Sequence, residues 1–205
     1  MILHNFIVFE GVDGAGTSTQ INMLKEKFGT TLFATSEPTS LPTGMFLRKM
    51  LSGAFPVDER TAAYLFAADR CEHVYGKGGI IEHIRNGKLV VCDRYLFSTL
   101  AYQSVSCGEE IPRLVNSPFP LPELLFYFRI DPSLSFKRVV ERSAQAEIYE
   151  KADFQRRVAA QYDAVMQAYK KTEALKIITL DASLPIQETA EIIWSYLQNL
   201  PIVSV

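Results

Sequence analysis

The sequence predicts an α/β fold in which a five-stranded parallel sheet carries helices on both faces. Short apolar runs alternate with longer amphipathic stretches along the 205 residues, which is the pattern of strands joined by helices. The short runs are almost continuously apolar, as expected for strands that are covered on both faces. A glycine-rich turn also joins the first apolar run to a helical stretch.

Five short runs are predicted to be the strands of this sheet. In chain order they are residues 6–9, 31–34, 89–92, 124–128 and 177–180. The second run is the weakest candidate, and the other four are strongly apolar. Each is four or five residues long, which favours strands over helices.

Two helices are predicted from apolar residues spaced three and four positions apart. One face is formed by Phe154, Val158, Tyr162, Val165 and Tyr169. A similar face occurs at Ala190, Ile193 and Leu197, after Pro185 in a plausible first helical turn. We expect both faces to pack in the core and assign them no chemistry.

A single domain of residues 1–205 is expected, because the sequence contains neither an internal repeat nor a low-complexity segment. The proline-rich segment 117–122 is interpreted as a rigid connection within that domain. The length is sufficient to bury a substantial core.

Composition restricts the expected partners. A net charge of −2 argues against a broad basic face for duplex DNA or anionic lipid. No apolar run approaches the ~18 residues of a membrane span. Cys71, Cys92 and Cys107 are widely spaced and form no CxxC pair, which favours reduced thiols. We therefore expect a cytoplasmic protein that binds neither nucleic acid nor membrane.

The turn after the first strand has the glycine spacing of a phosphate-binding loop. Gly11 and Gly16 occupy the two glycine positions, and Ser18 stands where a hydroxyl would coordinate Mg²⁺. Backbone N–H groups of such a loop, and the helix predicted to begin near Thr17, would face the phosphates. Thr17 occupies the position of the motif's lysine, however. The turn by itself leaves nucleotide binding and an ordinary tight turn as alternatives.

Further motifs resemble those of the thymidylate kinases. Residues 93–103, DRYLFSTLAYQ, are similar to the family's DRY-xxS-xxAYQ signature. Other segments resemble family motifs in the same order: residues 9–14 (FEGVDG), Glu37-Pro38 with Gly44 and Arg48, residues 65–70 (LFAADR), residues 122–124 and residues 180–183. The resemblance covers essentially the whole chain. It implies a P-loop NTPase fold of the nucleoside monophosphate kinase type, with a small helical lid at about residues 142–153.

The resemblance also implies a function, namely the ATP-dependent phosphorylation of dTMP to dTDP for dTTP synthesis. Mg²⁺ is the implied cofactor, ATP and dTMP are the implied small-molecule partners, and a homodimer is expected. Two alternatives stay open. One is a nucleotide-binding protein of the same fold whose turnover is impaired, and the other is a kinase that uses another deoxynucleoside or its monophosphate.

By resemblance, ATP lies over the glycine-rich loop and the start of the next helix. Its candidate ligands are Gly11, Gly14, Gly16, Thr17, Ser18, Thr19 and Arg138. Ser18 and Asp93 are the candidate Mg²⁺ ligands, since a carboxylate at a strand end can bind the metal through water. The implied catalytic residues are Asp13, Asp93, Arg94 and Arg142.

The acceptor dTMP is expected to lie opposite ATP. Its candidate contacts are Asp13, Glu37, Pro38, Arg48, Phe66, Arg70, Arg94, Ser98, Thr99, Tyr102, Gln103 and Tyr149. Arg48 and Arg94 would hold the acceptor phosphate, because the guanidinium group donates two parallel bonds. Arg70 would read the edge of the thymine.

The remaining acceptor roles concern the base and the sugar. Phe66 would stack on the thymine, and Gln103 would pair with its polar edge. Tyr102 would lie against the sugar and disfavour a 2′-hydroxyl. Core packing is the alternative for both aromatic rings, and capping of the following helix is the alternative for Ser98 and Thr99.

Three departures from the family pattern affect the expected rate. Thr17 replaces the lysine whose positive charge, ~4 Å from a phosphate, would contribute roughly 4 kcal/mol gross at an effective dielectric of about 20. Without another cation to compensate, the rate of phosphoryl transfer is expected to be lower by a factor of about 100 to 1,000. Ile148 stands where the family often has arginine, which leaves Arg142, Arg138 and Lys137 as candidate cations, with solvated helix charges as the alternative. Residues 39–41 replace the family's Gly-Gly-Thr, so the path of that loop is expected to differ.

Overall fold

The computed structural model describes residues 1–140, 148–198 and 200. Within them, five strands form one sheet: β1 (Ile2–Gly11), β2 (Leu32–Ser36), β3 (Leu89–Asp93), β4 (Leu121–Arg129) and β5 (Lys176–Asp181). Their order is β2-β3-β1-β4-β5, and all neighbouring strands run parallel. The predicted α/β fold is confirmed.

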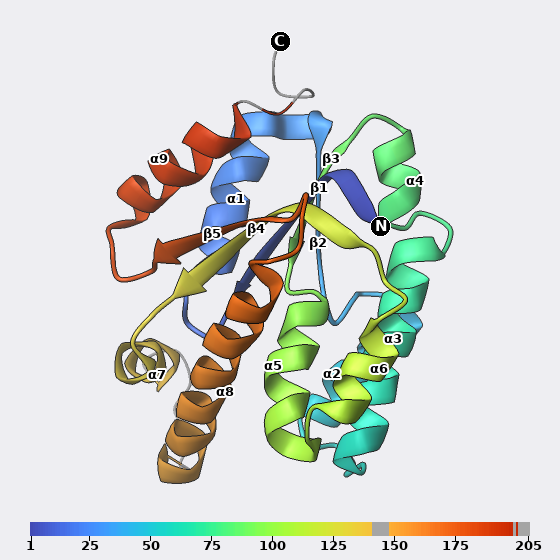
Figure 1. Ribbon diagram of the computed structural model, residues 1–205, viewed down its shortest axis with the longest axis vertical. Helices are drawn as coiled ribbons and strands as arrows, with labels where there is room; N and C mark the ends of the chain where they lie inside the picture. Colours follow the sequence, from blue (N-terminus) through green and yellow to red (C-terminus); the bar gives the residue numbers. More distant parts are fainter. Residues whose placement is uncertain (141–147, 199, 201–205) are drawn as a thin grey trace.

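The helices connect these strands and follow the last one. They are α1 (Thr17–Phe28), the 3-10 helix η1 (Gly29–Thr31), α2 (Pro42–Leu51), α3 (Glu59–Tyr75), α4 (Ile80–Arg85), α5 (Leu96–Cys107), α6 (Glu110–Asn116), α7 (Pro132–Val140), α8 (Ile148–Tyr169) and α9 (Ile186–Leu197). Helices α1 and α9 pack together on one face of the sheet, and α5 and α8 pack together on the other (Figure 1).

The sheet is buried because its central strands are apolar on both faces. Residues 6–9 of β1 and 89–92 of β3 are fully buried, as are most residues of β4. Burial of such continuous apolar runs on both sides is the main stabilising contribution in a layered α/β domain. The four strongly apolar runs are all strands, as predicted.

All five strands extend beyond the predicted runs, and the assignments at two of their ends are wrong. Leu121 and Pro122 were expected in the proline-rich connection but are the first residues of β4. Pro122 pairs in register with Leu3 at the start of the sheet, just before an irregularity in the β1–β4 pairing, where proline costs little. Thr31 ends η1, so β2 begins one residue later than predicted.

The parallel strands bring their carboxyl ends to one edge of the sheet. Phe9 near the end of β1 is in register with Asp93 at the end of β3, and Asp93 is in register with Ser36 at the end of β2. The loops that follow these three strands therefore meet at the same edge, where ligands of open α/β sheets bind.

The predicted lid is only partly described. Arg142 lies outside the described residues, and residues 148–153 form the beginning of α8. Tyr149 belongs to this helix, but its side chain also lies outside the description. The assignment of residues 142–153 to a lid stays a prediction.

Candidate active site

The glycine-rich loop between β1 and α1 has a backbone path that requires glycine. Gly14 and Gly16 have φ angles of 82° and 96°, in the left-handed region that other residues rarely adopt. At Gly11, a Cβ atom would lie 2.9 Å from the carbonyl oxygen of Phe128. Helix α1 begins at Thr17, as predicted, and directs its N-terminus toward the loop.

A first cavity of about 270 Å³ lies beside this loop. Its lining includes Gly14, Gly16 and Thr19 of the loop and α1, together with the apolar Leu184 and Ile186. A cavity lined by both glycine backbone and apolar side chains, next to a helix N-terminus, suits a nucleotide.

Arg138 supplies a cation to the first cavity. Its guanidinium donates to the carbonyl oxygens of Gly14, at 3.3 Å, and Ala182, at 3.0 Å. Helix α7 is further fixed to the loop by Ser135, whose hydroxyl donates to the carbonyl oxygen of Asp13 at 2.6 Å. Among the predicted cations that the structure describes, Arg138 lines this cavity.

Ser18 and Asp93 lie together at the strand ends. The Ser18 hydroxyl donates to Oδ2 of Asp93 at 2.7 Å. The other oxygen, Oδ1, is buried and has no hydrogen-bond partner within the described part of the chain. A carboxylate oxygen of this kind, beside a hydroxyl, fits a hard divalent cation.

A second cavity of about 450 Å³ lies on the other side of the loop. Every predicted acceptor residue whose side chain the structure describes lines it. These residues come from α2, α3, α5 and the loops after β1, β2 and β3, so residues distant in sequence are brought to one site.

Arg94 and Asp13 form an ion pair at one end of the second cavity. The distance from Nη2 of Arg94 to Oδ1 of Asp13 is 2.6 Å. Arg94 has a φ angle of 69°, and its backbone N–H donates to the carbonyl oxygen of Phe9. Gln155 of α8 reaches Oδ2 of Asp13 at 3.5 Å. The guanidinium of Arg94 thus balances the charge of the Asp13 carboxylate beside the glycine-rich loop.

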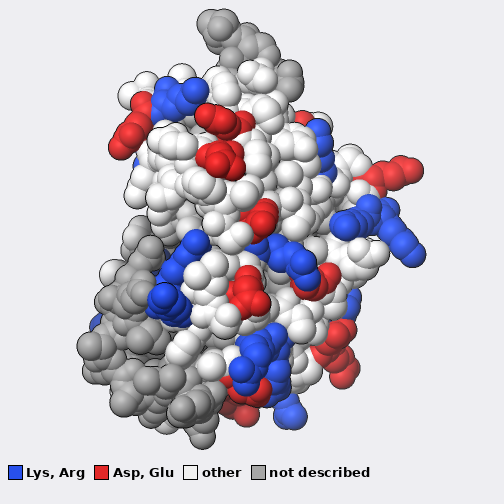
Figure 2. Space-filling view, turned by 90° about the vertical axis from the view of Figure 1, so that its left-hand side faces the viewer, with Lys and Arg blue, Asp and Glu red and all other residues white. Residues whose placement is uncertain are grey.

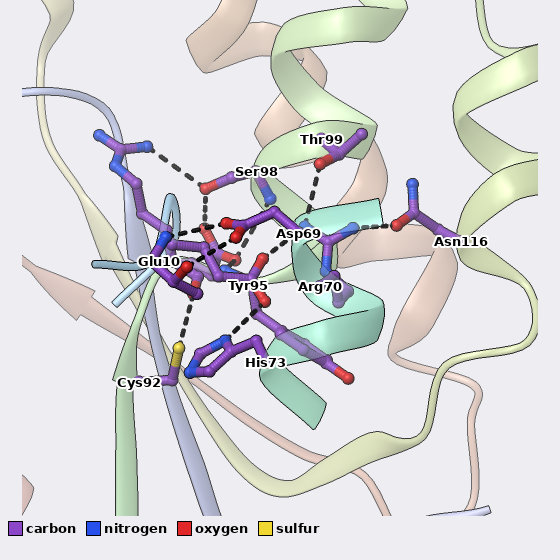
Figure 3. A network of polar contacts seen from close by, with 12 residues as sticks. Glu10, Asp69, Arg70, His73, Cys92, Tyr95, Ser98, Thr99 and Asn116 are labelled. Carbon is purple, nitrogen blue, oxygen red and sulfur yellow. Dashed lines mark hydrogen bonds and ion pairs between the residues drawn. The ribbon is translucent and has the colours of Figure 1, made fainter. Parts of the chain in front are cut away.

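Glu10 is a fully buried carboxyl group next to this ion pair. Figure 3 shows its contacts with Tyr95 and Ser98, whose backbone N–H groups donate to Oε1 at 2.8 and 3.2 Å. The hydroxyls of Ser98 and Tyr162 donate to Oε2 at 2.7 and 2.9 Å. Burial raises the pKa of Glu10 to about 7, although these hydrogen bonds and Arg94 act in the opposite direction.

Tyr162 and Glu10 were missed as site residues by the sequence reasoning. The ring of Tyr162 is buried on the predicted apolar face of α8, but its hydroxyl bonds Glu10 and Ser98 and lies 3.3 Å from Arg94. The face packs in the core as predicted, and the polar contacts of the Tyr162 hydroxyl are an addition that the apolar spacing did not indicate. For Glu10 the sequence did contain a signal, because a charged residue directly after an apolar strand indicates a candidate site residue.

Arg70 lies in a buried polar network between α3, α5 and α6. Its guanidinium donates to Oε2 of Glu37 at 2.6 Å and to the hydroxyl of Thr99 at 3.1 Å, and it also donates to Asn116 (Figure 3). The side chain is 1% exposed, and its Nε has no partner among the described residues. The network holds Arg70 rigidly against the cavity.

The loop that departs from the family pattern is fixed to α3. Asp69 accepts from the backbone N–H of Thr39 at 2.8 Å and from its hydroxyl at 2.6 Å. Thr43 donates to the same carboxylate at 2.7 Å. Arg48 donates to the carbonyl oxygens of Pro38 and Thr39. Thr39 thus supplies a side-chain anchor that a glycine would lack.

Tyr102 covers the Arg94 guanidinium. The guanidinium carbon lies 5.2 Å from the centroid of the Tyr102 ring, within cation–π range. The phenolic oxygen is buried without a hydrogen-bond partner among the described residues.

On the face drawn in Figure 2, basic side chains are interspersed with acidic ones. Among the helices that the structure describes, none is both long enough and apolar enough to cross a membrane. The three cysteines are free thiols.

A phosphate loop with a cavity on each side, at the carboxyl edge of this parallel sheet, defines a P-loop nucleoside monophosphate kinase. The family model of the thymidylate kinases matches residues 9–193. The chain belongs to the thymidylate kinase family.

Individual relatives agree with the family assignment. A putative thymidylate kinase of Treponema pallidum is 38% identical over 97% of each chain. A probable thymidylate kinase of Methanocaldococcus jannaschii is 36% identical over 98% of this chain and 100% of its own. A thymidylate kinase of Leptospira interrogans is 35% identical over 87% of this chain and 86% of its own. These similarities favour the kinase over a protein without turnover or a kinase for another acceptor.

Proposed function

We propose that this chain transfers the γ-phosphate of ATP to dTMP, giving ADP and dTDP. The observation that carries the proposal is that one loop borders both cavities, since Gly14 lines the first and Asp13 lines the second. ATP in the first cavity and dTMP in the second would meet at this loop. Phosphoryl transfer depends mainly on such positioning and on neutralising charge.

Arg94 is proposed to hold the acceptor phosphate. Its guanidinium is fixed near the loop by Asp13 and the hydroxyls of Ser98 and Tyr162. Arg48 also lines the second cavity and is exposed enough to turn from the loop carbonyls toward a phosphate. Two guanidinium groups at this end favour an acceptor that already carries a phosphate.

The base of the acceptor is proposed to lie at the other end of the second cavity. Phe66 offers a ring for stacking, and Gln103 offers a carboxamide for the polar edge of the thymine. Arg70 lies beside them with one unpartnered N–H at Nε. Tyr102 lies between the two ends, where it would contact the sugar.

The donor site is proposed to use Arg138 in place of the missing lysine. Arg138 already lies in the first cavity, and Arg142 is the second candidate from the predicted lid. Ser18 and Asp93 would hold Mg²⁺, which when bound neutralises charge on the donor phosphates. Thr17 can donate one hydrogen bond but brings no charge.

A homodimer is proposed to form through α3. Four exposed residues lie on one face of this helix at intervals of four, three and four: Tyr64, Ala68, Cys71 and Tyr75. Exposed apolar residues of the neighbouring α2 and α6, such as Phe46 and Leu114, extend the apolar surface. We further propose that the protein acts in the cytoplasm, which suits its free thiols.

Initial rates of ADP release with ATP, Mg²⁺ and either dTMP or thymidine test the proposed function. We expect turnover with dTMP and only background release with thymidine, which lacks the phosphate that Arg94 would hold. Faster release with thymidine than with dTMP would contradict the proposal.

A further inference from the structure

A third cavity of about 440 Å³ adjoins the base end of the second cavity. It lies beside the end of α2 and the connection from α2 to α3, over α3 and α5. We call it the apolar annex, and its apolar lining consists of Met50, Leu51, Phe55, Pro56, Val57 and Ala62. Leu51 and Gln103 line both cavities, so the annex adjoins the proposed acceptor site at these two residues.

The chemistry of the annex suits an uncharged group. Ala62 is buried in its floor, and Leu51 at the junction is 59% exposed. An exposed leucine between two cavities leaves apolar surface that a ligand can cover. The charged Glu59 is exposed.

Gln103 marks the boundary between the annex and the acceptor site. The residue is only 9% exposed, and its carboxamide makes no hydrogen bond to another residue within the described part of the chain. The donors and the acceptor of this carboxamide are therefore available to the polar atoms of a bound ligand. The polar edge of a pyrimidine would supply such atoms.

The annex lies at the correct end of the acceptor site. Leu96 begins α5 just after Arg94, and Gln103 lies seven residues farther along the same helix, or about 10 Å. This separation is comparable to the span from the phosphate to the base of a nucleoside monophosphate. A nucleotide with its phosphate at Arg94 therefore brings its base next to the annex.

We propose that the apolar annex binds an apolar substituent on C5 of the acceptor pyrimidine. The ligand class is 5-substituted deoxyuridine monophosphates whose substituent is longer than methyl. C5 is the ring position at which thymine carries its methyl group, so extension there keeps every polar atom of the nucleotide. This inference rests on the proposed function, because it takes the second cavity as the acceptor site.

Calorimetric titration of the full chain tests the inference with dUMP, dTMP, 5-ethyl-dUMP and 5-(1-propynyl)-dUMP. Each carbon buried in the annex is expected to tighten binding by about fourfold at most, so 5-(1-propynyl)-dUMP should bind at least as tightly as dTMP. If the site instead ended in a closed pocket for the methyl group, the longer substituent would clash with its wall. Binding of 5-(1-propynyl)-dUMP that is more than about tenfold weaker than binding of dTMP would therefore overturn the inference.

A filling variant tests whether the annex itself holds the substituent. Val57→Trp places a large side chain in the annex, and Ala54→Trp places the same side chain at an exposed position of the same connection that does not line it. Val57→Trp should lower the affinity for 5-(1-propynyl)-dUMP, relative to that for dTMP, by at least about tenfold. Ala54→Trp should leave both affinities unchanged. If the affinity for 5-(1-propynyl)-dUMP relative to that for dTMP is the same in the two variants, the inference is contradicted.

The outcome for dTMP distinguishes the two proposals. If dTMP binds and is phosphorylated but the extended nucleotides bind poorly, the annex proposal fails and the proposed function stands. If the wild-type chain does not bind dTMP at all, both fail.

Discussion

Asp13 of the phosphate loop and Arg94 of the β3–α5 connection are joined by an ion pair of 2.6 Å, although they lie 81 positions apart in the chain. The pair links the loop that borders the first cavity to the wall of the second cavity. Asp13 is about half exposed and Arg94 is less so, which leaves the pair accessible to an acceptor phosphate.

Arg94→Lys should lower kcat/KM for dTMP by about a hundredfold or more. Lysine keeps the charge but loses the two parallel donors that can serve Asp13 and a phosphate together. Steady-state kinetics at saturating ATP would measure the loss. Arg113→Lys, in an exposed pair with Glu109 on α6, is the matched control and should be neutral. Equal kinetics for both variants would remove Arg94 from the acceptor site.

Arg138→Ala should lower kcat/KM for ATP by about tenfold to a hundredfold, with a smaller effect on the affinity for dTMP. The reason is that the variant loses the guanidinium that lines the proposed donor cavity. The expected size of the fall in kcat/KM follows because a hydrogen bond to a charged group contributes about 1.5–3 kcal/mol. Lys137→Ala removes an exposed charge from the adjacent position and is the control.

A double variant tests whether Arg138 stands in for the missing lysine. Thr17→Lys should not abolish activity, and it should restore part of the loss when combined with Arg138→Ala. A folded Thr17→Lys enzyme without activity would show that the loop is built around threonine and does not accept the lysine.

Glu10→Gln should change how stability depends on pH. The pKa of Glu10 rises from 4.5 in the unfolded chain to about 7 in the fold, so the folded state holds a proton that the unfolded state releases between these values. The contribution of Glu10 to stability is therefore complete below about pH 4.5 and is lost as pH rises through 7, by on the order of 3 kcal/mol.

Urea denaturation of wild type and Glu10→Gln at pH 5 and pH 8 would measure this dependence. The free energy of unfolding of the wild type should fall, relative to that of the variant, as pH increases. Parallel pH profiles for the two proteins would mean that Glu10 is ionised throughout the range.

Ala68→Arg should convert the proposed dimer into a monomer. The substitution places a charge at the centre of the exposed face of α3, between Tyr64 and Cys71, where it would be buried without a partner in a dimer. Sedimentation at several concentrations would report the mass. A wild-type chain that is monomeric at all concentrations would exclude the dimer itself.

The sequence predicted the sheet because strands depend on local patterns, and the motif residues that it singled out come together at one cavity. Continuous apolar runs identified the strands, and the loops after them carried the motif residues that now line one cavity. Pro122 was misplaced because a proline is compatible with a strand only where pairing is irregular, as it is beside Leu3. The irregular pairing of β1 with β4 cannot be recognised from the residues around Pro122 alone.

The contacts made by Tyr162 and Asp69 could not be predicted for a different reason. Spacing places Tyr162 on the buried face of α8 but does not show that its hydroxyl reaches Glu10 on β1. Likewise, Asp69 lies within a recognised segment, whereas its bonds to Thr39 depend on how α3 packs against the loop. Such contacts between distant segments arise only once the fold is assembled.

The identity of the acceptor is tested most directly by detecting the product in a competition. The purified chain is incubated with ATP, Mg²⁺ and an equimolar mixture of dTMP, dUMP, dCMP, dGMP and thymidine, and the phosphorylated products are separated and quantified by mass. We predict that dTDP forms first and in excess over every other product. Formation of another diphosphate or of dTMP from thymidine ahead of dTDP, or no product from a folded chain that binds dTMP, would contradict the assignment of this chain as a kinase for dTMP.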